Sequence, residues 1–99
     1  MMTVNKIKNG NSLVIAPEGR LDTITAPELD NEIKASIDGI TSLEFDLTNL
    51  EYISSAGLRV LLSAQKVMNK QGEMKVCNVN ETIMEIFEVT GFSDILDIE

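Results

Sequence analysis

The stretch that decides the fold runs from Leu43 to Gln71 and reads LEFDLTNLEYISSAGLRVLLSAQKVMNKQ. Its opening residues, 43–47, alternate apolar and acidic side chains, which predicts a half-buried strand. Residues 48–53 are interpreted as a short loop. From Leu58 onward, apolar residues recur at helical spacing. The stretch therefore predicts a strand, a loop and a long helix.

Upstream of this stretch the sequence predicts a hairpin and a helix. Asn9-Gly10 is typical of a type I′ turn, in which both residues take positive φ, between strands near residues 3–8 and 13–16. The segment Thr25-Ala26-Pro27-Glu28 fits a capping box, with the Thr25 side chain accepting a helical N–H and Glu28 reaching back. This helix is expected to end near Gly39.

Downstream, residues 74–79 predict another strand, and Asn80 is expected to cap a third helix that Gly91 ends. An apolar tail, residues 92–98, is expected to pack back on the core. The predicted order is β-β-α-β-α-β-α with a terminal extension. Alternation after the hairpin predicts an α/β fold with a mixed, mainly parallel sheet of four or five strands covered by helices. A chain of 99 residues fits one domain, residues 1–99.

Composition restricts the partners. The formal net charge is −8 at pH 7 and no basic stripe is present, which disfavours nucleic acid and anionic lipid surfaces. No apolar run approaches the roughly 18–20 residues that span a bilayer, and the N-terminus leads into no signal-peptide core. We therefore expect a cytoplasmic protein with no direct membrane insertion. The single cysteine, Cys77, excludes an intramolecular disulfide and is interpreted as a small core residue on a strand.

Several catalytic chemistries are excluded. With no histidine, a Ser-His-Asp, Cys-His or His-containing metal site cannot form. The glycine-rich phosphate-binding motifs are missing as well. Ser63-Ala64-Gln65-Lys66 matches S-x-x-K, but it lies deep inside a predicted helix and is interpreted as a coincidence. The sequence predicts a non-enzymatic binding module with no metal site.

The junction before the long helix is the candidate functional site. Ser54 and Ser55 end the loop, and Ala56 and Gly57 have almost no side chain, so the backbone is expected to be open to a partner. A helix N-terminus tolerates a phosphate group. Arg59 follows Ser55 by four residues and could meet a phosphate or an acidic group of a partner. The alternatives are that one serine caps the helix while the other fills space, and that Arg59 is an exposed charge.

Residues 45–62 closely resemble the central motif of the STAS domain family of anti-sigma factor antagonists, and residues 19–29 and 86–92 agree with it. The resemblance implies a mixed sheet with helices and no cofactor. It implies that Ser55 is phosphorylated by a partner that is both a serine kinase and an anti-sigma factor. Phosphorylation would release that partner, and a serine phosphatase would reset the cycle. Asp46 matches the acidic residue that commonly ends the strand before the motif.

The sequence departs from the family at one position. Many members have Asp directly before the phosphorylated serine, whereas this chain has Ser54, which becomes a rival phosphorylation site. Ser55 is favoured. One alternative function is a STAS subunit of a membrane lipid-transport ABC complex, which binds an ATPase without phosphorylation. A nucleotide-binding or nucleotide-hydrolysing domain is a third.

Overall fold

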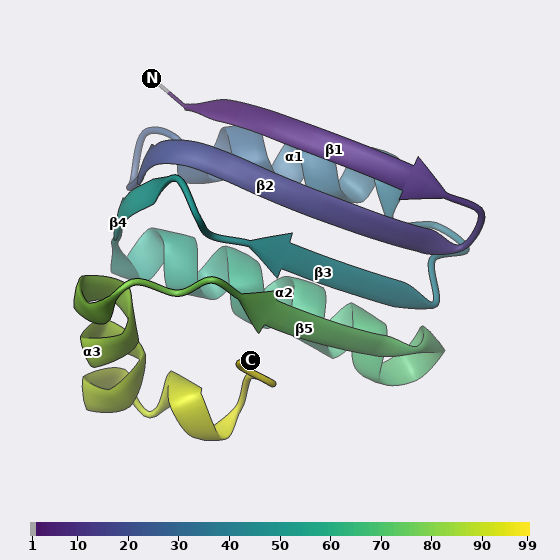
Figure 1. Cartoon of the computed structure of the whole chain (residues 1–99). Coiled ribbons are helices and arrows are strands. Elements are labelled where there is room, and N and C mark those ends of the chain that lie inside the picture. The colour runs from purple at the N-terminus through teal and green to yellow at the C-terminus, as the bar shows by residue number, and fades with distance from the viewer. Residues whose placement is uncertain (1) are drawn as a thin grey trace.

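The computed structural model describes residues 2–99, which alternate strands and helices after an initial hairpin (Figure 1). In chain order the elements are β1 (Thr3–Asn9), β2 (Ser12–Leu21), α1 (Ala26–Ser36), β3 (Ser42–Asp46), β4 (Leu50–Ile53), α2 (Ser55–Gln71), β5 (Glu73–Cys77), α3 (Glu81–Thr90) and the 3₁₀ helix η1 (Phe92–Asp94). The predicted order is confirmed except at residues 48–53. That segment is not simply a loop, because it contains the short strand β4.

The strands form a mixed sheet in the order β1-β2-β3-β5, with β4 paired to β2 beyond the end of β3. β1 runs antiparallel to β2, whereas the β2–β3, β3–β5 and β2–β4 pairs are parallel. The expected mainly parallel sheet of four or five strands is therefore confirmed, with five strands in the described residues.

The β1–β2 hairpin forms where it was predicted, but its turn is of the other primed type. Asn9 pairs with Ser12, so Gly10 and Asn11 are the central residues. Gly10 has φ +60°, and neither asparagine has positive φ. Positive φ at the first central residue alone is the pattern of a type II′ turn, for which glycine is required.

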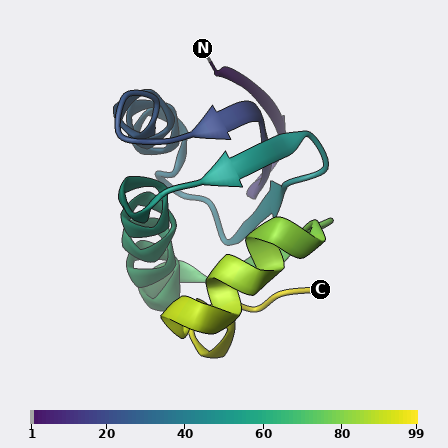
Figure 2. The same ribbon diagram turned by 90° about the vertical axis from the view of Figure 1, so that its left-hand side faces the viewer.

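The core lies between the sheet and the helices α1 and α2, which cover one face (Figures 1 and 2). Alternate residues of the central strands point into it and are buried: Leu13, Ile15, Leu43, Phe45, Met74 and Val76. Because side chains alternate along a strand, the intervening residues lie on the opposite face and are only half-buried. α3 packs beside β4, where the Asn80 amide group donates to the Leu50 carbonyl at 3.0 Å.

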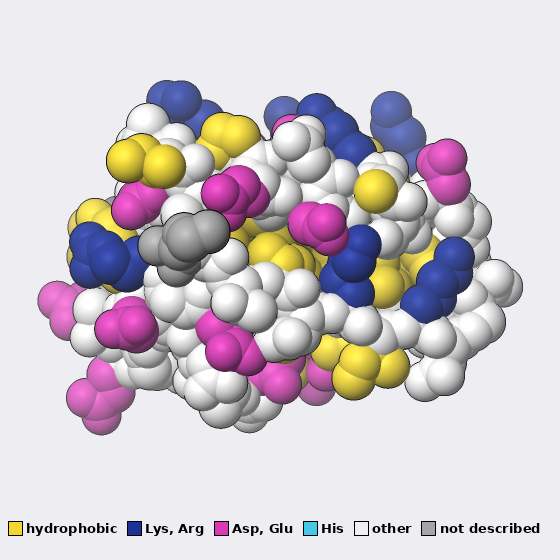
Figure 3. Space-filling view, turned by 90° about the horizontal axis from the view of Figure 1, so that it is seen from above, with side chains coloured by type: hydrophobic (Ala, Val, Ile, Leu, Met, Phe, Trp, Pro, Cys, Tyr) yellow, Lys and Arg dark blue, Asp and Glu magenta, His cyan; other side chains and the backbone are white. Residues whose placement is uncertain are grey.

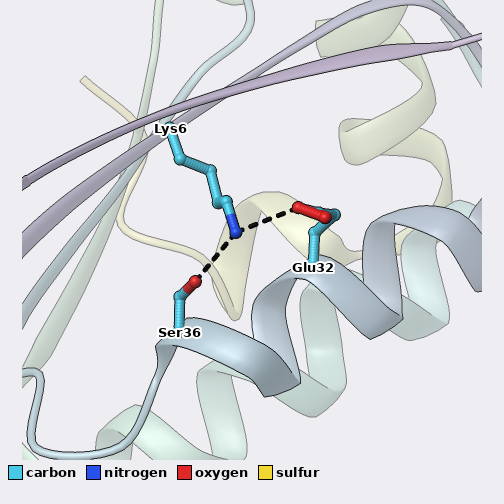
Figure 4. Close-up of polar contacts among 3 residues, drawn as sticks. All are labelled: Lys6, Glu32 and Ser36. Carbon is cyan, nitrogen blue, oxygen red and sulfur yellow. Dashed lines mark hydrogen bonds and ion pairs between the residues drawn. The ribbon is translucent and has the colours of Figure 1, made fainter.

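The edge strand β1 is tied to α1 by one lysine (Figure 4). Lys6 Nζ lies 2.9 Å from a carboxylate oxygen of Glu32 and donates to the Ser36 hydroxyl at 3.0 Å. A partly exposed ion pair of this kind contributes at most about 1 kcal/mol. The contact links the edge strand to the helix that covers one face of the sheet (Figure 1).

The predicted capping box at the start of α1 is wrong. Thr25 makes no side-chain cap bond. Its hydroxyl instead accepts from the Asp22 amide at 2.8 Å and donates to the Arg20 carbonyl at 2.7 Å. Asp22 Oδ1 accepts from the amides of Ile24 and Thr25 at 3.0 and 3.1 Å. Asp22 therefore binds the Thr25 amide that Glu28 was expected to bind, while the Glu28 amide donates to the Thr25 carbonyl at 3.0 Å. The hydrogen bond from the Thr25 amide is the main cause that lowers the pKa of Asp22.

The C-terminal predictions are confirmed. Asn80 caps α3 by accepting from the Ile83 amide at 2.8 Å, and Gly91 ends the helix in the left-handed conformation. The tail then returns to β5, because the Val76 amide donates to the Asp97 carbonyl at 2.8 Å. Leu96 is buried in the core.

Candidate functional site at the start of α2

The start of α2 is fixed to the end of strand β2. Ile53, the last residue of β4, pairs with Leu21, the last residue of β2. The next residue, Ser54, is extended, and its amide donates to the Leu21 carbonyl at 2.8 Å. Ser55 is the first residue of the helix. The predicted junction therefore exists and is held rigidly by its neighbouring strand.

The two serines differ in accessibility. Ser55 is exposed, whereas the hydroxyl oxygen of Ser54 is buried and has no hydrogen-bond partner among the described residues. Ser54 occupies the N-cap position but makes no side-chain cap bond. The interpretation that one serine caps α2 is therefore wrong for the observed geometry.

Gly57 has a packing role that the sequence did not indicate. It is buried, and a Cβ atom there would come within 2.6 Å of Leu21 Cγ and 2.8 Å of Ile53 Cγ1. The expectation that its backbone is open to a partner is wrong. The missing side chain lets the first turn of α2 lie against β2 and β4. Ala56, half-buried, packs beside it against the core.

The N-terminal end of α2 keeps its positive character. The first backbone bond into the helix runs from the Leu58 amide to the Ser54 carbonyl at 2.9 Å, so the amides of residues 55–57 precede it. No acidic residue lies in the first turn of α2, whereas α1 and α3 have Glu28 and Glu81 there. The partial positive charge of the helix end is thus not offset by its own side chains.

Arg59 adds a full charge one turn further along α2. Its side chain is exposed. None of the ion pairs found among residues 2–99 involves Arg59. Together with the exposed Ser55 hydroxyl four residues earlier, it makes this end of the helix a surface suited to a negatively charged group.

Asp46, the sixth candidate residue, is engaged elsewhere. It ends β3, and its Oδ1 accepts from the Thr48 amide at 3.1 Å, from the Thr48 hydroxyl and from the Asn78 side chain at 2.9 Å. The bond from the Thr48 hydroxyl, followed by that from Asn78, lowers the pKa of Asp46. Asp46 therefore joins the loop after β3 to the end of β5, and its hydrogen bonds do not reach the α2 junction.

Cys77 is on a strand as predicted, but it is half-buried and does not belong to the core. Burial, followed by a hydrogen bond involving Glu44, raises the pKa of its thiol to about 11. A thiol with so high a pKa is a poor nucleophile at neutral pH.

A concave region lies between β1 and α1, away from this junction, on the side of the molecule viewed from above in Figure 3. It has a volume of about 370 Å³ and is lined by Met2, Val4, Glu28, Asn31 and Glu32. No pattern in the sequence marks it, because its lining combines the start of the chain and β1 with one face of α1. None of the predicted site residues lines it.

Residues 2–99 contain neither a metal-binding cluster nor a membrane-spanning helix. No cluster of three acidic or cysteine side chains there is arranged to hold a metal ion. None of the helices in this part of the chain combines the length and apolar character needed to cross a bilayer.

Fold and junction together define a small α/β domain that presents a serine hydroxyl at the positive end of a helix. The model of the STAS domain family matches residues 3–99, and the chain belongs to that family. BtrV of Bordetella bronchiseptica is 36% identical, over 98% of this chain and 84% of the relative. The anti-sigma-B factor antagonist of Bacillus subtilis is 30% identical, over 98% of this chain and 90% of the relative.

Solved structures agree on the fold. The crystal structure of an anti-sigma factor antagonist from Mycobacterium paratuberculosis has a TM-score of 0.90 and 23% identity, covering 99% of this chain and 85% of that one. The phosphorylated form of SpoIIAA, a Bacillus cell fate determinant, has a TM-score of 0.75 and 17% identity, covering 100% of this chain and 91% of that one. At these identities the likeness concerns the architecture.

Proposed function

We propose that this protein is an anti-sigma factor antagonist that binds a kinase-type anti-sigma factor and is released when Ser55 is phosphorylated. One observation supports the choice of residue: Ser55 is exposed at the first position of α2, whereas the neighbouring hydroxyl of Ser54 is buried. The name of the Bacillus subtilis relative supports the antagonist function, and the phosphorylated form of SpoIIAA supports regulation by phosphate.

The covalent step is a phosphoryl transfer from ATP held by the partner. The Ser55 oxygen forms a bond to the γ-phosphorus, the bond between that phosphorus and the β–γ bridging oxygen breaks, and ADP leaves. The hydroxyl proton passes to a base on the kinase. A serine phosphatase reverses the change by hydrolysis, in which water supplies the new oxygen of inorganic phosphate. This chain contributes only the acceptor hydroxyl. Because the kinase draws on cellular ATP, we propose that the exchange takes place in the cytoplasm.

Phosphorylation acts on the complex and not on the fold. A phosphate adds about −1.5 to −2 charges, and at the N-terminus of α2 this charge meets helix amides and a favourable dipole. Within an interface the same charge must be desolvated, which costs several kcal/mol unless the partner offers a matching cation. Each 1.4 kcal/mol or so of that cost weakens binding about tenfold.

The remaining candidate residues support the site in different ways. Arg59 is proposed to contact the partner directly. Ser54, Ala56 and Gly57 position the first turn of α2 below the surface. Asp46 shapes the neighbouring loops through Thr48 and Asn78.

Binding measurements with the purified kinase-type anti-sigma factor of the same organism test the proposal. We expect the wild type and Ser55→Ala to bind similarly, whereas Ser55→Glu should weaken the complex at least tenfold. Ser63→Glu is the matched control, because Ser63 is exposed on the same helix about two turns away. Equal binding by Ser55→Glu and Ser63→Glu would contradict the proposal.

A further inference from the structure

We propose that Ile24 is the apolar anchor by which this chain holds its kinase-type partner, an inference that rests on the function proposed above. Ile24 lies in the turn between β2 and α1 and is 82% exposed. A single exposed aliphatic side chain is ordinary on a protein surface. The rigidity of this turn and its position make Ile24 different.

The turn around Ile24 is fixed on both sides by hydrogen bonds. The amides of Ile24 and Thr25 both donate to the Asp22 carboxylate, and the Ala26 amide donates to the Asp22 carbonyl at 2.8 Å. Thr25 itself is 5% exposed and anchored to the end of β2. A side chain carried on such a backbone loses little conformational entropy when it enters a partner's pocket.

The turn lies at the same end of the molecule as Ser55. β2 and β4 are parallel neighbours, and Figure 2 shows them running in the same direction into α1 and α2. Leu21, three residues before Ile24, supplies the carbonyl that binds the Ser54 amide and packs against Gly57. A partner that reaches the Ser55 hydroxyl therefore meets the Ile24 turn beside it.

Ile24 and Ser55 have different roles in the complex: Ile24 contributes binding, and Ser55 accepts the phosphate. Ile24 fits an apolar pocket on the kinase-type anti-sigma factor, next to the ATP-binding site from which Ser55 is phosphorylated. Because Ile24 is uncharged and lies outside the reacting groups, its contact is made in both the bound complex and the transition state. Its loss should therefore raise KM for phosphorylation and leave kcat unchanged.

The test compares Ile24→Ala with Ile7→Ala, using the purified kinase-type anti-sigma factor of the same organism. Ile7 is 62% exposed on β1, opposite Val14, at the other end of the sheet. Calorimetry should show binding about tenfold weaker for Ile24→Ala and unchanged for Ile7→Ala. Both variants should unfold at the wild-type temperature, because neither side chain is in the core.

The outcomes separate this inference from the proposed function. If Ile24→Ala binds like the wild type while Ser55→Glu loses binding, the anchor is refuted and the phosphorylation switch stands. An equal loss for Ile7→Ala and Ile24→Ala would also refute the anchor. If the wild type neither binds this kinase nor is phosphorylated by it, both proposals are refuted.

Discussion

Gly57 lies directly against Leu21, and a Cβ atom on the glycine would come within 2.6 Å of the leucine Cγ. This contact joins the first turn of α2 to the last residue of β2. The same leucine binds the Ser54 amide through its carbonyl. The position of the Ser55 hydroxyl is thus set by the packing of a helix on a strand, and any change in that packing should move the proposed phosphorylation site.

Gly57→Ala should destabilise the domain by about 1–3 kcal/mol, because the added methyl group overlaps Leu21 and Ile53. In an open helix the same change would stabilise by about 1 kcal/mol. Urea unfolding measures the difference in the free energy of unfolding between Gly57→Ala and the wild type. Ser63→Ala, at an exposed position of α2, is the control and should be within about 0.5 kcal/mol of the wild type. A Gly57→Ala variant as stable as the wild type would refute the packing role.

Ser54→Ala should leave stability unchanged or raise it by up to about 1 kcal/mol, because the removed hydroxyl is buried without a partner. Asn80→Ala is the contrasting cap variant. Asn80 does bind the Ile83 amide, so its loss should cost about 1 kcal/mol. Thermal unfolding measures the stability of both variants. An equal loss of stability in the two would mean that Ser54 also caps its helix.

Thr25→Val should destabilise by about 1–3 kcal/mol. The substitution keeps the shape but leaves the Asp22 amide and the Arg20 carbonyl without their partner. Thr25→Ser retains the hydroxyl and should lose much less stability than Thr25→Val. Urea unfolding compares the two, and a Thr25→Val variant no weaker than Thr25→Ser would show that the hydroxyl does not hold the turn.

Asp46→Asn should destabilise by about 0.5–1 kcal/mol at pH 7, through weaker bonds to Thr48 and Asn78. The sign of the pH effect follows from the lowered pKa of Asp46 in the folded state. The unfolded carboxyl has a pKa near 3.8, so the stabilisation is complete above that pH. It is lost as the pH falls below 3.8 through the folded-state pKa.

Urea unfolding at pH 7 and at a series of values below 3.8 measures this effect. The difference in the free energy of unfolding between the wild type and Asp46→Asn should shrink as the pH falls. A gap that stays constant across the series would show that the charge of Asp46 contributes nothing to stability.

Much of the fold could be predicted because local signals were strong and unopposed. Asn80 and Gly91 mark the ends of α3, and both act as their residue types predict. Alternation in residues 43–47 gave β3 in nearly its observed place. In these segments side-chain spacing, capping chemistry and burial agree, so the sequence pattern alone was sufficient.

The errors arose where a contact outside the recognised pattern competed, either from a near neighbour in sequence or from another strand. The Thr25–Glu28 capping pattern is present, but the Asp22 carboxylate already binds the local amides. β4 has only four residues, which is too short for a clear alternation, and it exists because β2 extends far enough to pair with it. The role of Gly57 depends on Leu21, whose nearness no local pattern reveals.

The sequence favoured Ser55 over Ser54 only through its resemblance to the family motif. Ser54 and Ser55 are adjacent and chemically identical, and only the backbone direction at the helix start decides which hydroxyl reaches solvent. The extended conformation of Ser54 turns its oxygen inward, and Ser55 then opens the helix on the exposed side.

Mass spectrometry of the phosphorylated protein tests the central claim most directly. The wild type, Ser54→Ala and Ser55→Ala are each incubated with ATP and the kinase-type anti-sigma factor of the same organism. Our account predicts a gain of one phosphate by the wild type and by Ser54→Ala, and none by Ser55→Ala. Full phosphorylation of Ser55→Ala, or its loss in Ser54→Ala, would contradict the claim that the exposed first hydroxyl of α2 is the switch.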